Sequence, residues 1–234
     1  MKVACYSGTR NLYSDMVPAI KSLLHNSDVD KIYLLIEDDE FPEYLPPEVE
    51  TINVTDEKYA FFAKDGPNYN SSWTYMILFR VCLSKIFPEI DKILNLDVDT
   101  IVVDNINDIW DMVPDDKYFG AVREYNSHNR PYGPIYYNIG VVVYNLKKIR
   151  EDHIDDLLIR FIDTQKLNCP EQDAWNKFGV WNEQELPIKY NEVSYTGFTD
   201  NPCIVHLSGS SDSTTPRREY KKKYAEMSWE DVRK

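Results

Sequence analysis

The fold of this chain is decided by the stretch KILNLDVDT, residues 92–100. Its first half is a short apolar run that predicts a buried β-strand, and the run ends at Asp97. Asp99 follows after one intervening residue. In a kinked backbone both carboxylates can turn to one side and share a hard cation, Mn²⁺ or Mg²⁺, with phosphate oxygens completing the shell. A solvated acidic turn is the alternative interpretation of a bare D-x-D pattern.

The rest of the chain alternates between apolar runs of strand length and amphipathic stretches of helix length. Strands are predicted at residues 2–6, 31–37, 50–54, 91–96, 100–103, 118–122, 137–145 and 203–207. Helices are predicted at about residues 14–25, 72–87, 105–112, 149–166 and 171–178. This alternation is typical of an α/β fold with a Rossmann-like, mostly parallel central sheet flanked by helices. Such folds gather their functional residues at the carboxyl ends of the strands.

The composition limits the class of partner. The chain has 234 residues, with 26 Lys and Arg against 39 Asp and Glu, for a net charge of −13. This length suits one compact domain, or a domain with a small extension. The acidic balance predicts no nucleic-acid partner, because binding a polyphosphate needs a cationic footprint. An acidic protein can still bind a diphosphate through a divalent metal.

The sequence also bears on the cellular compartment. It opens without a basic segment followed by an apolar one, and its apolar runs are far too short to span a bilayer. The four cysteines lie far apart and lack C-x-x-C spacing. We therefore expect reduced thiols in a cytoplasmic protein.

Several polar side chains interrupt apolar runs. His206 ends the run at 203–207, where a neutral imidazole can complete a metal shell or act as a hydrogen-bonded structural residue. The small residues after it, including Gly209, leave room for a phosphate. Asn138 and Gly140 break an apolar strand, which indicates the close approach of a ligand or of another backbone.

Two further positions carry charge or polarity near helices. Arg80 lies in a mostly apolar helix and needs a partner there, which we expect to be Asp97, Asp99 or a diphosphate. The run Glu171-Gln172-Asp173 opens a helix after a proline. Acidic residues at this position are also ordinary helix caps, so the run alone does not decide between the two interpretations.

Taken together and in order, these motifs resemble glycosyltransferase family 8. They are Arg80, DKILNLDVDTIV (91–102), YYNIGVVVYNLKKI (136–149), EQDAWN (171–176) and VHLSG (205–209). The resemblance covers roughly residues 2–209, and the ordered set is far more specific than any one motif. It implies a GT-A fold, a UDP-sugar site that depends on Mn²⁺ or Mg²⁺, and transfer with retention at the anomeric carbon.

The resemblance also implies roles for individual residues. The metal ligands would be Asp97, Asp99 and His206, and the reacting centre would be formed by Glu171, Gln172 and Asp173, with Asp173 contacting the donor sugar or supporting the other two. The nucleotide and donor sugar would be bound by the first turn and by positions around the metal: Tyr6, Ser7, Gly8, Asn11, Tyr13, Arg80, Asp97, Val98, Asp99, Asn138, Gly140, Gln172, His206 and Gly209.

Three departures from the family pattern stand out. The chain has Asp212 where relatives carry a Lys that binds the diphosphate, so either Arg217 or Arg218 replaces that cation or the metal acts without it. Glu171 stands where relatives have Asp, which adds a methylene at a position with strict geometry. The opening turn carries Gly8-Thr9-Arg10 where relatives carry other polar residues, which leaves the contacts to the base open.

We divide the chain into a nucleotide-sugar transferase domain, residues 1–216, and a basic aromatic tail, residues 217–234. The tail has seven Lys or Arg and four Asp or Glu, together with Tyr220, Tyr224 and Trp229. In relatives of the family that this chain resembles, such a segment often contacts an anionic membrane that carries lipid-linked acceptors, so the resemblance implies a contact at the inner face of the membrane. A terminal helix packed on the domain is the equal alternative.

The predicted function is a retaining, metal-dependent hexosyltransferase. It would move a hexose from a UDP-sugar to a hydroxyl of a glycan, a lipid-linked glycan or a protein, by same-face attack assisted by the leaving phosphate. Asp212 motivates one alternative, a nucleotide-sugar binding module that has lost catalysis. The 17 tyrosines motivate another, self-glycosylation as in glycogenin.

Overall fold

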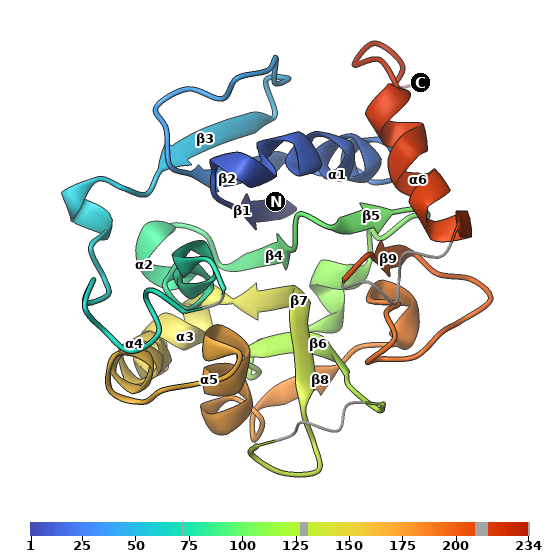
Figure 1. Cartoon of the computed structure of the whole chain (residues 1–234). Helices are drawn as coiled ribbons and strands as arrows, with labels where there is room; N and C mark the ends of the chain where they lie inside the picture. Colours follow the sequence, from blue (N-terminus) through green and yellow to red (C-terminus); the bar gives the residue numbers. More distant parts are fainter. Residues whose placement is uncertain (72, 127–130, 209–214, 234) are drawn as a thin grey trace.

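The computed structural model describes residues 1–71, 73–126, 131–208 and 215–233. Its centre is a seven-stranded sheet in the order β3-β2-β1-β4-β7-β6-β8 (Figure 1). Strand β7 runs antiparallel to both of its neighbours, and the other strand pairs are parallel. The strands are β1 (Val3–Ser7), β2 (Lys31–Ile36), β3 (Val49–Asn53), β4 (Lys92–Leu96), β6 (Phe119–Arg123), β7 (Tyr137–Asn145) and β8 (Glu183–Glu185). The predicted α/β fold is confirmed.

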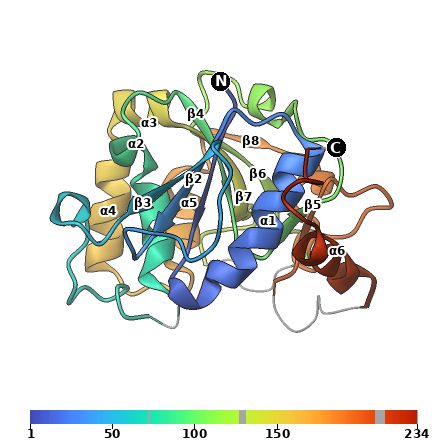
Figure 2. The ribbon, with the colours of Figure 1, turned by 90° about the horizontal axis from the view of Figure 1, so that it is seen from above.

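Helices cover both faces of this sheet (Figures 1 and 2). One face carries α1 (Tyr13–Asn26), with α6 (Thr215–Glu226) packed beside it. The other face carries α2 (Leu83–Ile86), α3 (Leu146–Asp152), α4 (Ile154–Thr164) and α5 (Pro170–Phe178). Short 3-10 turns connect these elements at Arg10–Leu12, Glu57–Tyr59, Tyr75–Val81, Ile109–Met112 and Ile188–Tyr190.

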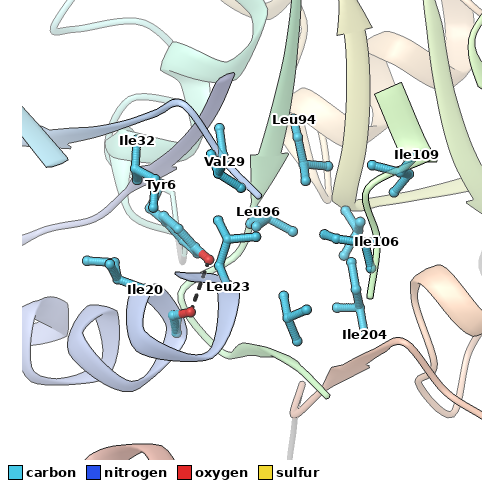
Figure 3. Packing of buried hydrophobic residues seen from close by; sticks show 14 of the residues in the cluster. Tyr6, Ile20, Leu23, Val29, Ile32, Leu94, Leu96, Ile106, Ile109 and Ile204 are labelled. Carbon is cyan, nitrogen blue, oxygen red and sulfur yellow. Dashed lines mark hydrogen bonds between the residues drawn. The ribbon is translucent and has the colours of Figure 1, made fainter. Parts of the chain in front are cut away.

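The two faces of the sheet form two hydrophobic clusters, as the alternation of side chains along a strand requires. In β1, Ala4 and Tyr6 pack on the α1 side, whereas Val3 and Cys5 pack on the α5 side. Figure 3 shows the first cluster, in which the Tyr6 hydroxyl donates to the Ala19 carbonyl of α1. This packing fixes the carboxyl end of β1 against α1.

A second, two-stranded sheet pairs β5 (Thr100–Val102) antiparallel with β9 (Ile204–His206). Its register places Thr100 opposite His206. The backbone N–H of Leu207 also donates to the Asp99 carbonyl at 2.8 Å. This small sheet therefore brings the D-x-D turn, which follows β4, next to a histidine more than 100 residues away in the sequence.

Two predicted helices are broken. The predicted helix at 72–87 is a 3-10 helix over Tyr75–Val81 followed by α2, because the backbone of Cys82 leaves the helical region. The predicted helix at 149–166 is α3 followed by α4, separated by His153 in the left-handed conformation at φ 54°. Amphipathic spacing continues across both breaks, so it cannot reveal them.

The C-terminal segment packs against α1. Tyr224 is buried, and its hydroxyl accepts a hydrogen bond from Asn26 Nδ2 at 2.7 Å. Lys221 Nζ lies 2.7 Å from Asp15 Oδ1. This is the arrangement of the alternative in which the tail packs on the domain. The division at residue 216 and the membrane contact stay predictions. Among the helices of the described residues, none combines the length and the apolar character needed to cross a bilayer.

Candidate active site

A cleft of about 540 Å³ opens where the strand ends of the sheet meet the small sheet and the start of α5. Ten of the predicted site residues line it, and they come from six separate segments of the chain. They are Ser7, Arg80, Asp97, Val98, Asp99, Asn138, Gly140, Glu171, Gln172 and His206. The carboxyl-end rule holds here for β1 and β4, and His206 comes from the end of β9 in the separate small sheet. The antiparallel β7 instead contributes its beginning.

Asp97, Asp99 and His206 form a group with the composition of a metal site. One ligand atom from each residue lies within 4.8 Å of the others. His206 Nε2 is 3.2 Å from Asp99 Oδ1 and 3.5 Å from Asp97 Oδ2. Two carboxylate oxygens and an imidazole nitrogen suit Mn²⁺ or Mg²⁺, so the donor set fits the predicted cation.

Gly140 leaves the space that this group needs. A Cβ at position 140 would stand 2.7 Å from Asp97 Oδ2 and closer still to the His206 ring. Any side chain there would therefore push two of the three candidate ligands aside. The Gly140 carbonyl also accepts a hydrogen bond from the Asp97 backbone N–H at 2.8 Å, which fixes the start of the D-x-D turn.

The three groups perturb one another electrostatically. Burial raises the pKa of Asp97, although Arg80 and His206 oppose that shift. For Asp99, burial favours the neutral form, but His206 outweighs it and lowers the pKa. Burial likewise disfavours a charged His206, but Asp99 and Asp97 outweigh it and raise the pKa of the imidazole. The site therefore attracts positive charge, and a proton on His206 competes with a metal ion.

Arg80 joins the candidate metal ligands to α5. It is 7% exposed and forms ion pairs with Asp97 Oδ1 and with Glu171 Oε1, the latter at 3.0 Å. The predicted pairing with Asp97 is present, and the pairing with Glu171 is a further partner. Burial raises the pKa of Glu171 to about 7, although the Arg80 charge acts in the other direction. A strongly raised carboxyl pKa in a cleft is typical of functional sites.

Gln172 is held by hydrogen bonds at both ends of its amide. Its Oε1 accepts from the Ile139 backbone N–H at 3.0 Å, and its Nε2 donates to Glu124 Oε1 at 3.2 Å. Asn138 Nδ2 donates to the same Glu124 oxygen at 2.9 Å. Glu124 thus holds two predicted donor-binding amides at the same wall of the cleft.

The first turn is only partly in the cleft. Ser7 lines it, and its buried Oγ has no hydrogen-bond partner among the described residues. The Tyr6 side chain instead points into the hydrophobic cluster, so only its backbone is left for a donor contact (Figure 3). Gly8 is buried beside Met16, and Asn11 is exposed. Tyr13 lines a separate, open hollow next to Arg10 and Asp38.

Asp173 does not line the cleft. It is 2% exposed and accepts hydrogen bonds from the Tyr136 hydroxyl and from the backbone N–H groups of Asn168 and Cys169. These contacts tie the residues just before α5 to its first turns and fix Tyr136, which does line the cleft. Of the two predicted roles for Asp173, this placement fits support and not sugar contact.

Two predicted positions, Gly209 and Asp212, lie outside the described residues. The two arginines considered as substitutes for the missing Lys lie in α6. Arg218 is exposed there, and the side chain of Arg217 is outside the description.

Ten further residues of the cleft wall were not predicted, and three of them, Glu124, Trp73 and Tyr195, bear on what the cleft can bind. Glu124 follows β6, so the carboxyl-end rule could have found it. Trp73 and Tyr195 are 50% and 41% exposed on the cleft. Trp73 was counted among the apolar residues of the predicted helix at 72–87, and Tyr195 lies in a stretch without strand or helix periodicity, so only the surplus of aromatic residues pointed to a binding role for them.

Comparison with known proteins shows which family this chain matches and which proteins it is similar to. The model of the family described as "Glycosyl transferase family 8" matches residues 13–221. Glycosyltransferase GlyD of Streptococcus pneumoniae is 28% identical over 239 residues, covering 88% of this chain and 28% of GlyD. General stress protein A of Bacillus subtilis is 24% identical over 170 residues, covering 60% of this chain and 59% of that protein. The chain thus spans less than two thirds of either relative.

Solved structures show the same fold. The glycosyltransferase GlyE of Streptococcus pneumoniae superposes with a TM-score of 0.73 at 20% identity, covering 99% of this chain and 62% of that one. The galactosyltransferase LgtC, crystallised with donor and acceptor sugar analogs, superposes with a TM-score of 0.69 at 17% identity and 95% coverage of both chains. The predicted GT-A fold is confirmed by these neighbours. Since the family model spans most of its length, the chain belongs to glycosyl transferase family 8.

Proposed function

We propose that this chain is a retaining hexosyltransferase that moves a sugar from a UDP-sugar to an acceptor hydroxyl and requires a divalent cation, Mn²⁺ or Mg²⁺. The observation that carries the proposal is the convergence of Asp97, Asp99 and His206 in a cleft that Glu171 and Gln172 also line. Membership of the family supports the reaction class.

Asp97, Asp99 and His206 would hold the cation. When bound, it would neutralise the charge that develops on a departing diphosphate. Arg80 keeps Asp97 in place through a buried ion pair, and the Gly140 carbonyl accepts the Asp97 backbone N–H. The exposed part of Asp99 leaves polar atoms for the nucleotide, and so does Ser7 Oγ, which has no hydrogen-bond partner within the described part of the chain.

The reacting centre would lie at the start of α5. Glu171 Oε1 pairs with Arg80, its Oε2 is buried, and both ends of the Gln172 amide are hydrogen-bonded within the protein. A covalent nucleophile needs an oxygen that can reach the anomeric carbon. This arrangement supports the other route, in which the two side chains orient the sugar and stabilise positive charge while the acceptor attacks on the face that the phosphate leaves.

The rim of the cleft favours a glycan acceptor. The Trp73 indole is half exposed, and its Nε1 donates to the Asn168 carbonyl at 2.8 Å, which holds the ring in place. Tyr195 is also exposed on the same cleft. Flat aromatic faces with a fixed orientation bind the apolar face of a pyranose at little entropic cost. We therefore place an acceptor sugar against these two rings.

The experiment is UDP release. The protein is incubated with a panel of UDP-sugars, with Mn²⁺ or with chelator, and with mono- and oligosaccharide acceptors. Release of UDP that needs both metal and a saccharide acceptor supports the proposal. Binding of a UDP-sugar without turnover under any condition would favour the impaired binding module. Added hexose mass on the protein itself would favour self-glycosylation.

A further inference from the structure

A row of buried side-chain amides lies behind the candidate metal ligands. Asn191 is fully buried and does not line the cleft. Its Oδ1 is 3.0 Å from His206 Nδ1, and its Nδ2 donates to Asn138 Oδ1 at 2.8 Å. Because Asn191 touches a candidate metal ligand and a candidate donor-binding residue but faces no substrate, its function must be exerted through these two neighbours.

One backbone N–H group determines which way the side-chain amides of Asn138 and Asn191 are turned. A side-chain amide can be turned either way, so its orientation has to come from an unambiguous neighbour. The Gly140 backbone N–H can only donate, and it lies 3.0 Å from Asn138 Oδ1. This oxygen must therefore also accept from Asn191, which turns the Asn191 oxygen toward His206. Glu124, an acceptor, satisfies the other end of Asn138.

The tautomer of His206 follows from this orientation. An oxygen acceptor beside Nδ1 requires a proton on Nδ1, so in the neutral ring Nε2 carries the lone pair. Nε2 is the nitrogen that faces Asp97 and Asp99. We propose that Asn191 is a positioning residue that fixes the Nδ1–H tautomer of His206 and so keeps Nε2 free for a metal ion. The inference rests on the proposed function only in assigning His206 to the metal.

The backbone keeps Asn191 in this position. The Glu192 N–H donates to the Ile204 carbonyl, and the His206 N–H donates to the Glu192 carbonyl, both at 3.0 Å. The residue after Asn191 is therefore tied to β9, the strand that carries His206. The Asn191 amide thus contacts the candidate metal ligand His206 through its oxygen and the candidate donor-binding residue Asn138 through its nitrogen. Substitutions can separate these two contacts.

Two variants separate them. Asn191→Leu removes both polar contacts at similar volume. Asn191→Asp keeps an oxygen for the His206 proton but places a second oxygen against Asn138 Oδ1. Asn145→Leu is the matched control. Asn145 is also buried, and its side chain accepts a hydrogen bond from the Lys148 N–H and donates one to the Asp115 carbonyl. It is the last residue of β7, whereas Asn138 lies near the start of that strand.

The first readout is the ¹⁵N spectrum of the imidazole in metal-free protein, at a pH above the raised pKa of His206. The chain has four histidines, so a His206→Gln variant assigns the signals. We expect Nδ1–H in the wild type, in Asn191→Asp and in Asn145→Leu, and a mixture of tautomers in Asn191→Leu. A wild-type proton on Nε2 would overturn the proposal whether or not any variant folds.

The second readout is Mn²⁺ affinity measured without nucleotide. Loss of such a hydrogen bond typically costs about 10- to 100-fold in metal affinity, which we expect for Asn191→Leu and not for Asn191→Asp or Asn145→Leu. Asn191→Asp should weaken UDP-sugar binding instead, through Asn138. Unchanged tautomer and Mn²⁺ affinity in Asn191→Leu would refute the positioning role. If the wild type binds no Mn²⁺, the metal assignment of the proposed function fails, and the spectra alone decide the role of Asn191.

Discussion

Arg80 and Glu171 form a buried ion pair, with 3.0 Å between Nη1 and Oε1, although 91 residues separate them in the sequence. The same guanidinium pairs with Asp97. One cation therefore ties the start of α5 to the D-x-D turn, and both carboxylates depend on it for compensation of buried charge.

Replacing Arg80 with Met should destabilise the protein by about 3–5 kcal/mol, because the buried Glu171 carboxylate and the partly buried Asp97 carboxylate lose the cation that they share. Denaturant unfolding of the metal-free protein measures this loss. Arg80→Lys keeps the charge but loses the two-pronged geometry, so its cost should be smaller. A loss below about 1 kcal/mol for Arg80→Met would show that the bridge does not hold the two segments together.

The pKa of Glu171, raised to about 7, makes stability depend on pH. The folded protein holds a proton that the unfolded chain, with an ordinary carboxyl pKa near 4.3, has already released, so stability falls as the pH rises from about 4 to about 7. Glu171→Gln removes this loss. In metal-free protein, the variant should gain roughly 2–3 kcal/mol over the wild type between pH 5 and pH 8. A difference between the two proteins that does not change with pH would mean that Glu171 titrates normally.

Gly140→Ala should abolish Mn²⁺ binding, because the added methyl group would overlap Asp97 and His206. Isothermal titration with Mn²⁺ measures the effect. Val141→Ala is the control: it leaves a cavity beside the same strand and lowers stability, but its side chain lies in the hydrophobic cluster and not in the cleft. Mn²⁺ affinity that is equal in Gly140→Ala and Val141→Ala would place the metal elsewhere.

Trp73→Ala should raise the KM for a saccharide acceptor about 10-fold or more and leave the KM for the donor nearly unchanged, because stacking by one ring contributes roughly 1.5 kcal/mol. Steady-state kinetics with each substrate varied in turn separates the two constants. Trp181→Ala, at a position that is 88% exposed and outside the cleft, is the control. Equal effects of the two substitutions would remove Trp73 from the acceptor site.

The sequence predicted those parts of the site that follow directly from strands. Asp97 ends one apolar run, Asp99 follows it after one residue, and His206 lies near the end of another, which marks all three as candidates under the strand-end rule. Their convergence depends on the antiparallel register of β5 and β9, which no local pattern encodes. Glu124 obeys the same rule, but a single acid after a strand has no distinctive spacing. Asn191 lies in a stretch without periodicity, and its position is set by backbone contacts with β9 that no local pattern encodes. The break between α3 and α4 at His153 could not be predicted either, because the helical spacing of apolar residues continues across it.

Asp99 provides the most direct test of the proposed reaction. Its side chain is 37% exposed and, unlike Asp97, it makes no ion pair with Arg80 among the contacts of the described residues, so Asp99→Asn should leave the fold intact. The measurement is UDP release from the preferred UDP-sugar, with Mn²⁺ varied, in the wild type and in Asp99→Asn. We expect turnover in the wild type that rises with Mn²⁺ and stops with chelator, and turnover at least 100-fold lower in the variant, on the order of the loss of one catalytic electrostatic group. Full activity of Asp99→Asn would contradict the metal-dependent mechanism.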